Sequence, residues 1–382
     1  MPEFTLTDEQ TSLRDLARKF ARSEMLPHVA ECDRIPRFPD EIYRKAWELG
    51  LMNLNVPAEY GGAGLGLLEQ CLITEELARA CGGMTTTISA NNLALEPIVL
   101  AGTPEQRQEI LAPFCAAYNL ASFCLTEPSG GSDAGGLTTY ARRDGDHYVL
   151  NGEKCFITNA PHASLYTVFA TVDPKLRHKA ITAFVVPRAS NGVTPGKDED
   201  KMGHRASSTS TVRFEDVQVP VASRLGAEGD GFSIAMRTLD QTRTPIGALA
   251  VGIAQAALDY ASAYALKRHA FGKPISEHQA IQIKLANMAQ DVLAARLLTW
   301  NAAWTIDHGQ AGTLESSIAK CFASDAAMRV ADEAIQIFGG YGYMREYPVE
   351  KLLRDAKLTQ IYEGSNEIQR IVIARELLKA YA

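Results

Sequence analysis

The 382-residue sequence has no run of about eighteen consecutive apolar residues, so it predicts no helix that spans a membrane. It also has no excess of positive charge: 38 Lys and Arg residues stand against 45 Asp and Glu residues, which gives a formal net charge of −7. This balance disfavours a surface for nucleic acid or anionic lipid. The N-terminal residues lack both the apolar core of a signal peptide and an arginine-rich transit pattern, so we expect a cytoplasmic protein.

Cysteine and histidine show none of the spacings that bind metals. The seven cysteines are scattered without a Cys-x-x-Cys pair, in apolar surroundings that are typical of buried, reduced thiols. The eight histidines have no ligand spacing either. No Gly-x-Gly-x-x-Gly motif lies between a strand and a helix, so a Rossmann site for a nicotinamide cofactor has no support. We therefore expect no metal and no nicotinamide.

Two helical segments flank a segment with strand patterns. Residues 1–119 and 227–382 carry apolar residues at helical spacing, whereas residues 120–226 contain six or more short runs rich in Val, Thr, Tyr and Phe. Asp144-Gly145 and Asn151-Gly152 each predict a hairpin turn. We expect an α+β multidomain fold with an N-terminal α-helical domain, a central antiparallel β barrel or sandwich, and a C-terminal domain like a four-helix bundle.

A carboxylate stands at a polar break near the C-terminus. Tyr362-Glu363-Gly364-Ser365 separates two stretches with apolar helical spacing, and the glycine permits a sharp turn that could hold Glu363 toward a buried site. On its own, such a break is more often a turn between helices than a catalytic centre. A second segment, residues 126–136, follows a strand and contains four glycines and several hydroxyls. It suits either a flexible loop or a loop whose N–H groups approach an anion.

Both segments resemble motifs of the acyl-CoA dehydrogenase family. Residues 361–370 resemble its C-terminal signature, and residues 126–133 resemble its Thr-Glu-Pro-x-x-Gly-Ser-Asp segment. The resemblance extends over nearly the whole chain and is closest to the medium-chain branch. It implies FAD-dependent α,β-dehydrogenation of a fatty acyl-CoA to a trans-2-enoyl-CoA in β-oxidation, with Glu363 as the base. It also implies a homotetramer, a dimer of dimers, that passes electrons to an electron-transfer flavoprotein.

The resemblance carries FAD contacts over to sixteen positions of this sequence. They are Phe123, Leu125, Thr126, Ser132, Phe156, Ile157, Thr158, Arg268, Phe271, His278, Gln279, Gln336, Gly339, Gly340, Ser365 and Glu367. Many members have tryptophan where Phe156 stands, so an aromatic wall survives but any indole contact is lost. Arg268 suits the FAD pyrophosphate because a guanidinium can bond two phosphate oxygens at once, although it also fits a helix-end charge. In the family, the contacts from residues 268–279 and 336–340 come from a second subunit.

Substrate contacts are implied for Ser132, Asp240, Arg243, Tyr362 and Gly364, with Arg243 near the nucleotide end of CoA. The isovaleryl and long-chain branches carry their catalytic glutamate at about the position of Thr242, so Glu363 is the only candidate base. Two alternatives remain: a relative with another oxidant or another bond broken, of the oxidase or desulfinase type, and a non-enzymatic acyl-CoA-binding protein. The sequence leaves the length of the acyl chain open.

Glu96 departs from the family pattern. It aligns near the closed end of the acyl pocket, where medium-chain relatives tend to be apolar. One interpretation is an outward-facing or helix-capping carboxylate. The other is a residue that shortens the pocket or favours an acyl group with a polar end, because burying an unpaired carboxylate is costly.

Overall fold

The computed structural model describes residues 5–35, 37–379 and 381. The first four residues, which belong to the segment used to judge targeting, lie outside this part. The described part of the N-terminal region contains six α-helices: α1 (Asp8–Phe20), α2 (Val29–Arg34), α3 (Asp40–Glu48), α4 (Leu67–Ala80), α5 (Gly82–Ala101) and α6 (Pro104–Ala116). The start of α1 is fixed by a capping box, in which the Thr7 hydroxyl accepts from the Gln10 N–H and the Gln10 side chain accepts from the Thr7 N–H.

Eight strands follow and form one sheet. They are β1 (Ala121–Cys124), β2 (Tyr140–Asp144), β3 (His147–Thr158), β4 (Leu165–Thr171), β5 (Ile181–Pro187), β6 (Val193–Pro195), β7 (Thr209–Pro220) and β8 (Arg224–Leu225). Their order is β6-β7-β3-β2-β4-β5-β8, and β1 also pairs with β4. Neighbouring strands are antiparallel with two exceptions. Strand β1 pairs with β4 in parallel, and β2 pairs with β4 in parallel through a single residue pair. The sheet therefore has a mixed element within the expected antiparallel arrangement.

The structure confirms one of the two predicted hairpin turns and contradicts the other. Asp144-Gly145 does join β2 to β3, with Gly145 at a φ of 62°. Asn151-Gly152 instead lies inside β3, where the register against β7 shifts between Leu150 and Gly152. Gly152 cannot carry a Cβ there, because it would lie 2.7 Å from the Thr139 Cα. The dipeptide marks a β-bulge rather than a turn, and both functions favour glycine for its backbone freedom.

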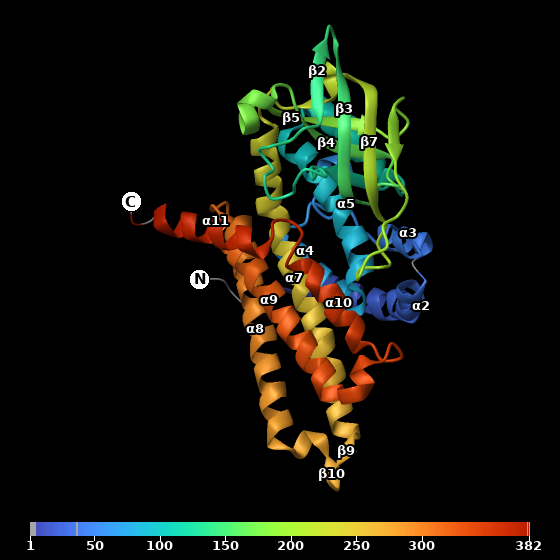
Figure 1. The fold of residues 1–382 in the computed structure, drawn as a ribbon, viewed down its shortest axis with the longest axis vertical. Helices are drawn as coiled ribbons and strands as arrows, with labels where there is room; N and C mark the ends of the chain where they lie inside the picture. The colour runs from blue at the N-terminus through green and yellow to red at the C-terminus, as the bar shows by residue number, and fades with distance from the viewer. Residues whose placement is uncertain (1–4, 36, 380, 382) are drawn as a thin grey trace.

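The C-terminal region is a bundle of long helices. Its elements are α7 (Gly231–Lys267), β9 (His269–Ala270), β10 (Lys273–Pro274), α8 (Gln279–Asp307), α9 (Thr313–Phe338), α10 (Val349–Thr359) and α11 (Asn366–Lys379). The sheet lies at one end of the molecule, the bundle extends away from it, and β9 and β10 form the far tip (Figure 1). The expected fold class is confirmed by this α–β–α architecture. The boundaries at 119/120 and 226/227 stay a prediction.

Helix α7 is the axis of the bundle. Small residues such as Ala250, Ala254 and Ala257 are fully buried against alanines of α9, so the two backbones approach closely. A Cβ at Gly252 would lie 2.4 Å from the Glu75 carbonyl oxygen, so α4 also crosses α7 at short range. By length and composition α7 could cross a membrane, but 67% of its most apolar window is buried inside the fold. That environment is the one of a core helix.

Polar contacts fix the N-terminal helices onto this bundle. Asp307, the last residue of α8, accepts from the N–H groups of Leu67 and Leu68 at 2.7 and 2.9 Å. It thereby caps α4, whose own N-cap residue, Gly66, has no side chain to do so. The Arg296 guanidinium of α8 pairs with Glu75 of α4 at 2.7 Å. Together these contacts hold α4, and α5 that follows it, beside α7. The candidate site lies between these helices.

Candidate active site

Glu363 lies in the turn between α10 and α11, with its backbone in the left-handed region at a φ of 53°. For a residue with a Cβ this conformation costs about 1–2 kcal/mol, so the surroundings must hold it. Three side chains do so. The Lys320 ammonium of α9 donates to the Gly364 carbonyl at 2.7 Å, and the Gln369 amide donates to it at 3.1 Å. The Arg243 Nε of α7 donates to the Glu363 carbonyl at 3.4 Å.

The Glu363 side chain is half-buried, and its carboxylate makes one short hydrogen bond. The Thr242 hydroxyl of α7 donates to its Oε2 at 2.7 Å. Burial raises the pKa of Glu363 above its ordinary value, while the Thr242 hydroxyl and the Arg243 and Lys320 cations oppose the rise without cancelling it. Burial also lowers the pKa of Lys320 to about 8, so this cation titrates just above neutral pH. A carboxylate with a raised pKa is better matched to proton transfer near pH 7 than an exposed one.

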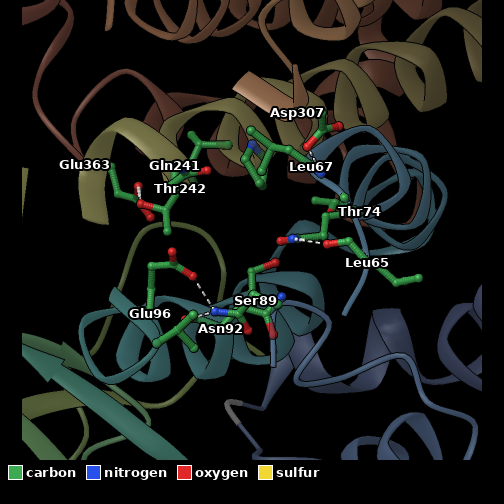
Figure 2. Close-up of a pocket in the computed structure, with 16 residues that line it drawn as sticks. Leu65, Leu67, Thr74, Ser89, Asn92, Glu96, Gln241, Thr242, Asp307 and Glu363 are labelled. Carbon is green, nitrogen blue, oxygen red and sulfur yellow. Dashed lines mark hydrogen bonds between the residues drawn. The ribbon is translucent and has the colours of Figure 1, made fainter. Parts of the chain in front are cut away.

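Two cavities meet at this carboxylate. The larger has a volume of about 870 Å³ and lies between the sheet, α7 and α11. The smaller, about 210 Å³, lies among α4, α5 and α7 and is shown in Figure 2. Ser89, Ile246 and Glu363 line both. The Glu363 side chain therefore lies at the border between the two cavities.

The larger cavity gathers most of the residues singled out from the sequence. Those that line it are Phe123, Leu125, Thr126, Ser132, Phe156, Ile157, Thr158, Asp240, Arg243, Tyr362, Glu363 and Gly364. They come from β1, from the loop after it, from β3, from α7 and from the Glu363 turn. The Phe156 ring is 70% exposed on this wall, at a φ of 57°. An aromatic ring held open beside a large cavity suits a flat aromatic group such as a flavin.

A buried ion pair fixes the loop after β1 against β3. The Lys154 ammonium donates to Glu127 Oε1 at 2.8 Å, and neither side chain is exposed. The Thr138 N–H and Thr139 N–H also donate to the Glu127 carboxylate. Burial alone would raise the pKa of Glu127, but Lys154 and these hydrogen bonds lower it to about 2. Because the Cys155 N–H donates to the Thr126 carbonyl at 2.9 Å, the loop and the Phe156 strand form one continuous wall.

A second group of expected cofactor residues lies elsewhere. Phe271, His278 and Gln279 lie at or beside the tip formed by β9 and β10, far from the sheet in Figure 1, and the Phe271 ring is 96% exposed. Arg268, Gly339 and Gly340 line a separate hollow of about 490 Å³, and Gln336 lies in the last turn of α9. Ser365 and Glu367 lie beside Glu363, at the start of α11. A single chain therefore does not bring all sixteen residues to one place.

Arg243 and Asp240 are engaged with the protein. Arg243 is 5% exposed, and its Nη1 donates to Asp240 Oδ1 at 2.7 Å. The other Asp240 oxygen accepts from the Thr313 hydroxyl at 2.8 Å. Both residues border the larger cavity, yet their polar atoms serve the Glu363 turn and the start of α9. Their expected contact with CoA stays a prediction.

Some residues of the site were not found from the sequence. Lys320, which holds the Glu363 turn, belongs to a polar series on a buried face of α9, at Ser316, Lys320 and Ser324. That spacing of four was the available signal. In the sequence, Thr242 stands out only because other branches of the family carry a glutamate at about this position. In the structure, its hydroxyl is the donor to Glu363. No local pattern indicates that the Thr242 hydroxyl donates to Glu363.

Three family models match the chain along its length. They are the acyl-CoA dehydrogenase N-terminal domain at residues 7–117, the middle domain at 122–217 and the C-terminal domain at 229–378. The chain belongs to the acyl-CoA dehydrogenase family. It is an oxidoreductase of the acyl-CoA dehydrogenase class, with FAD as its cofactor.

The chain is similar over nearly its whole length to individual members of this family. The mitochondrial short-chain specific acyl-CoA dehydrogenase of Bos taurus is 49% identical over 98% of this chain and 92% of its own. Butyryl-CoA dehydrogenase from Megasphaera elsdenii is 43% identical, with a TM-score of 0.96 over 99% and 100% of the two chains. A structure described as an electron transferring flavoprotein of Acidaminococcus fermentans gives 44% identity and a TM-score of 0.97 over 99% and 100%. An acyl-CoA dehydrogenase complexed with FAD from Bacillus anthracis gives 34% and 0.92, over 100% of this chain and 69% of that one. These relatives lend no support to the expected closeness to the medium-chain branch.

The positive φ of Glu363 predicts a difference between two variants that both lack its carboxylate. Glu363→Gly relieves the left-handed strain, whereas Glu363→Ala keeps a Cβ at that position. We expect the Gly variant to be more stable than the Ala variant by about 1 kcal/mol, even after the larger chain entropy of glycine in the unfolded state. Urea unfolding of the two proteins measures this difference. An Ala variant that is equally stable would show that the turn is not strained.

Proposed function

We propose that this enzyme removes the α-proton of a fatty acyl-CoA thioester with Glu363 as the base, yielding a trans-2-enoyl-CoA in β-oxidation. The observation that carries this proposal is the position of Glu363. Its half-buried carboxylate, with a raised pKa, lies where the two cavities meet. The short-chain and butyryl-CoA names of the relatives support a short acyl group.

The protein residues divide the work of the proton-transfer step. Thioester α-protons are weakly acidic, so the carbonyl oxygen needs a hydrogen-bond donor while the base takes the proton. The main-chain N–H of Glu363 makes no hydrogen bond to a described residue, so it is free to donate to that oxygen. The Thr242 hydroxyl orients the carboxylate toward the α-carbon and stabilises its ionised form.

The cofactor side of the site lies on the opposite wall. Phe123, Thr126, Phe156 and Thr158 would hold the ring system of FAD, and Ser132 would contact the cofactor or the CoA moiety. FAD, when bound, accepts the hydride that leaves the β-carbon. Tyr362 and Gly364 would border the thioester, while Asp240 and Arg243 hold the turn that presents Glu363.

The separated cofactor residues support a homotetramer, a dimer of dimers. Arg268, Gly339 and Gly340 reach an FAD only if another chain brings its larger cavity to their hollow. Electrons then pass to an electron-transfer flavoprotein, a proposal that the similarity to the Acidaminococcus fermentans structure supports. We keep a cytoplasmic location as part of the proposal, although the bovine relative is mitochondrial by name.

The proposed assembly predicts a link between flavin content and oligomeric state. A flavin-loaded sample should sediment as a tetramer, and Arg268→Ala should lose FAD because the pyrophosphate loses its bidentate partner. Analytical ultracentrifugation with absorbance at the flavin wavelength records both quantities together. A monomer that keeps one FAD per chain would rule the assembly out.

Replacing the base tests the proposed function. Glu363→Gln keeps the size of the side chain, so the fold, the bound flavin and acyl-CoA binding should persist. Glutamine cannot accept the α-proton, and Thr242 offers no substitute carboxylate. Loss of a positioned base costs at least ~10²–10⁴ in rate, so anaerobic butyryl-CoA should shift the flavin spectrum of the variant without bleaching it. Stopped-flow absorbance against the parent enzyme measures this.

Bleaching by the variant within tenfold of the parent rate would mean that Glu363 is not the base. The same experiment addresses the alternatives. A non-enzymatic acyl-CoA-binding protein would not bleach even with Glu363 intact. Fast reoxidation of the bleached parent by air would indicate an oxidase instead of a dehydrogenase.

The Thr242 hydroxyl predicts the pH dependence of the reaction. Thr242→Val removes the donor to the carboxylate, so the already raised pKa of Glu363 rises further. Because only the ionised form accepts a proton, the acid limb of kcat/KM should move to higher pH. A hydrogen bond to a charged group contributes roughly 1.5–3 kcal/mol, which corresponds to about one to two pH units.

Activity well above the limb should be largely retained in this variant. Thr299→Val is the matched control, because the Thr299 hydroxyl is also buried in a helix but donates to the Ala295 carbonyl. It should leave the limb in place. An unmoved limb in Thr242→Val, or one that moves to lower pH, would contradict the assignment.

A further inference from the structure

The smaller cavity has an unusual lining for the far end of an acyl chain. Ten of its sixteen lining residues are polar or charged, and five are apolar: Leu65, Leu67, Val99, Pro245 and Ile246. No Lys, Arg or His is among its described lining residues. The cavity continues from Glu363 away from the larger one, so it receives whatever lies beyond the α- and β-carbons of a bound acyl group.

Glu96 is one of three acidic residues that line this cavity, with Asp307 and Glu363. It lies in α5, is only 7% exposed, and its carboxylate is directed toward the Thr242–Glu363 pair (Figure 2). It is therefore neither outward-facing nor at a helix end. Oε2 accepts from the Asn55 amide at 2.6 Å, whereas Oε1 makes no hydrogen bond to a described residue. Burial raises the pKa of Glu96, while the Asn55 amide and the Arg237 cation oppose the rise without cancelling it.

Asn55 supplies a second acceptor without a donor. Its Nδ2 donates to Glu96 Oε2 and to the Asn92 carbonyl at 3.1 Å. Because the Asn92 carbonyl can only accept, the amide orientation is fixed and Oδ1 must point elsewhere. Asn55 Oδ1 is buried and has no hydrogen-bond partner. The third acid of the cavity, Asp307, is already satisfied by the N–H groups of Leu67 and Leu68.

Glu96 Oε1, which makes no hydrogen bond to a described residue, can accept from a donor in the ligand. We propose that the preferred acyl group is short and ends in an ammonium group, which binds Glu96 in the smaller cavity. An ammonium offers three N–H donors and a positive charge to this carboxylate. A methyl end would instead leave the second Glu96 oxygen without a donor, which weakens binding. This inference rests on the proposed function, because Glu363 must lie at the α-carbon for the chain end to reach Glu96.

Matched pairs of substrates test the proposal. Each pair differs only in the last group: pentanoyl-CoA against 4-aminobutanoyl-CoA, hexanoyl-CoA against 5-aminopentanoyl-CoA, and heptanoyl-CoA against 6-aminohexanoyl-CoA. The amino thioesters are used fresh, since the amine can attack its own thioester. We expect kcat/KM of the flavin-loaded enzyme to favour the amino member of the best-fitting pair by at least about tenfold, as for sites built to bond a polar group.

Variants of Glu96 then locate the preference. Glu96→Gln keeps the shape and removes the charge, so the ratio of amino to methyl substrate should fall at least about tenfold, and Glu96→Leu should reverse it. The ratio is internal to one sample, so partial misfolding does not change it. Glu76→Gln is the control, because Glu76 is another buried carboxylate but pairs with Arg18 outside the cavity. It should leave the ratio unchanged.

Two results would overturn the inference. One is a parent enzyme that prefers the methyl member at every length, and the other is a ratio that Glu96→Gln leaves unaltered. Either would mean that the cavity holds only water beyond a plain acyl chain. Failure of all six thioesters to bleach the flavin anaerobically would defeat the proposed function itself. Bleaching by the methyl members alone would defeat only the ammonium end.

Discussion

The site depends on burying a carboxylate while keeping it able to ionise. Burial raises the pKa of Glu363, and complete burial without donors would leave it protonated and useless as a base. The chain meets this constraint with the Thr242 hydroxyl on one carboxylate oxygen and with two cations, Arg243 and Lys320, which both donate to main-chain carbonyls of the turn. Because the cations bond main-chain carbonyls, they stabilise the strained turn and leave the carboxylate uncommitted to a salt bridge.

The N-terminal helices, the sheet and the C-terminal bundle all contribute residues to this site. The turn belongs to α10 and α11, its donors come from α7 and α9, and the walls of the cavities come from the sheet and from α4 and α5. Two sets of polar contacts between distant segments hold these regions in their relative positions. The Glu127–Lys154 pair fixes the loop after β1 to β3, and Asp307 caps α4 from the end of α8. Both contacts involve residues that are far in sequence from the Glu363 turn.

The sequence predicted what is local and missed what is not. Helical and strand segments follow from short-range periodicity, and the motif around Glu363 was found because its residues are contiguous. The parallel pairing of β1 with β4 and the bulge at Gly152 depend on partners distant in sequence, and Asn-Gly signals a turn or a bulge equally well. Likewise, nothing local indicates that Thr242 donates to Glu363 or that Asn55 meets Glu96. The separation of Arg268 from the larger cavity likewise depends on the packing of long helices, which no local pattern reveals.

Exchange of the α-proton tests the role of Glu363 most directly, because it separates proton removal from oxidation. A 3-thia acyl-CoA, with sulfur in place of the β-carbon, has α-protons but no β-hydride to lose. In deuterium oxide the flavin-loaded enzyme should exchange these α-protons rapidly, as mass spectrometry of the recovered thioester would record. Glu363→Gln should slow the exchange by at least ~10²-fold. Exchange by the variant at a rate near that of the parent would contradict the account, since another group would then be the base.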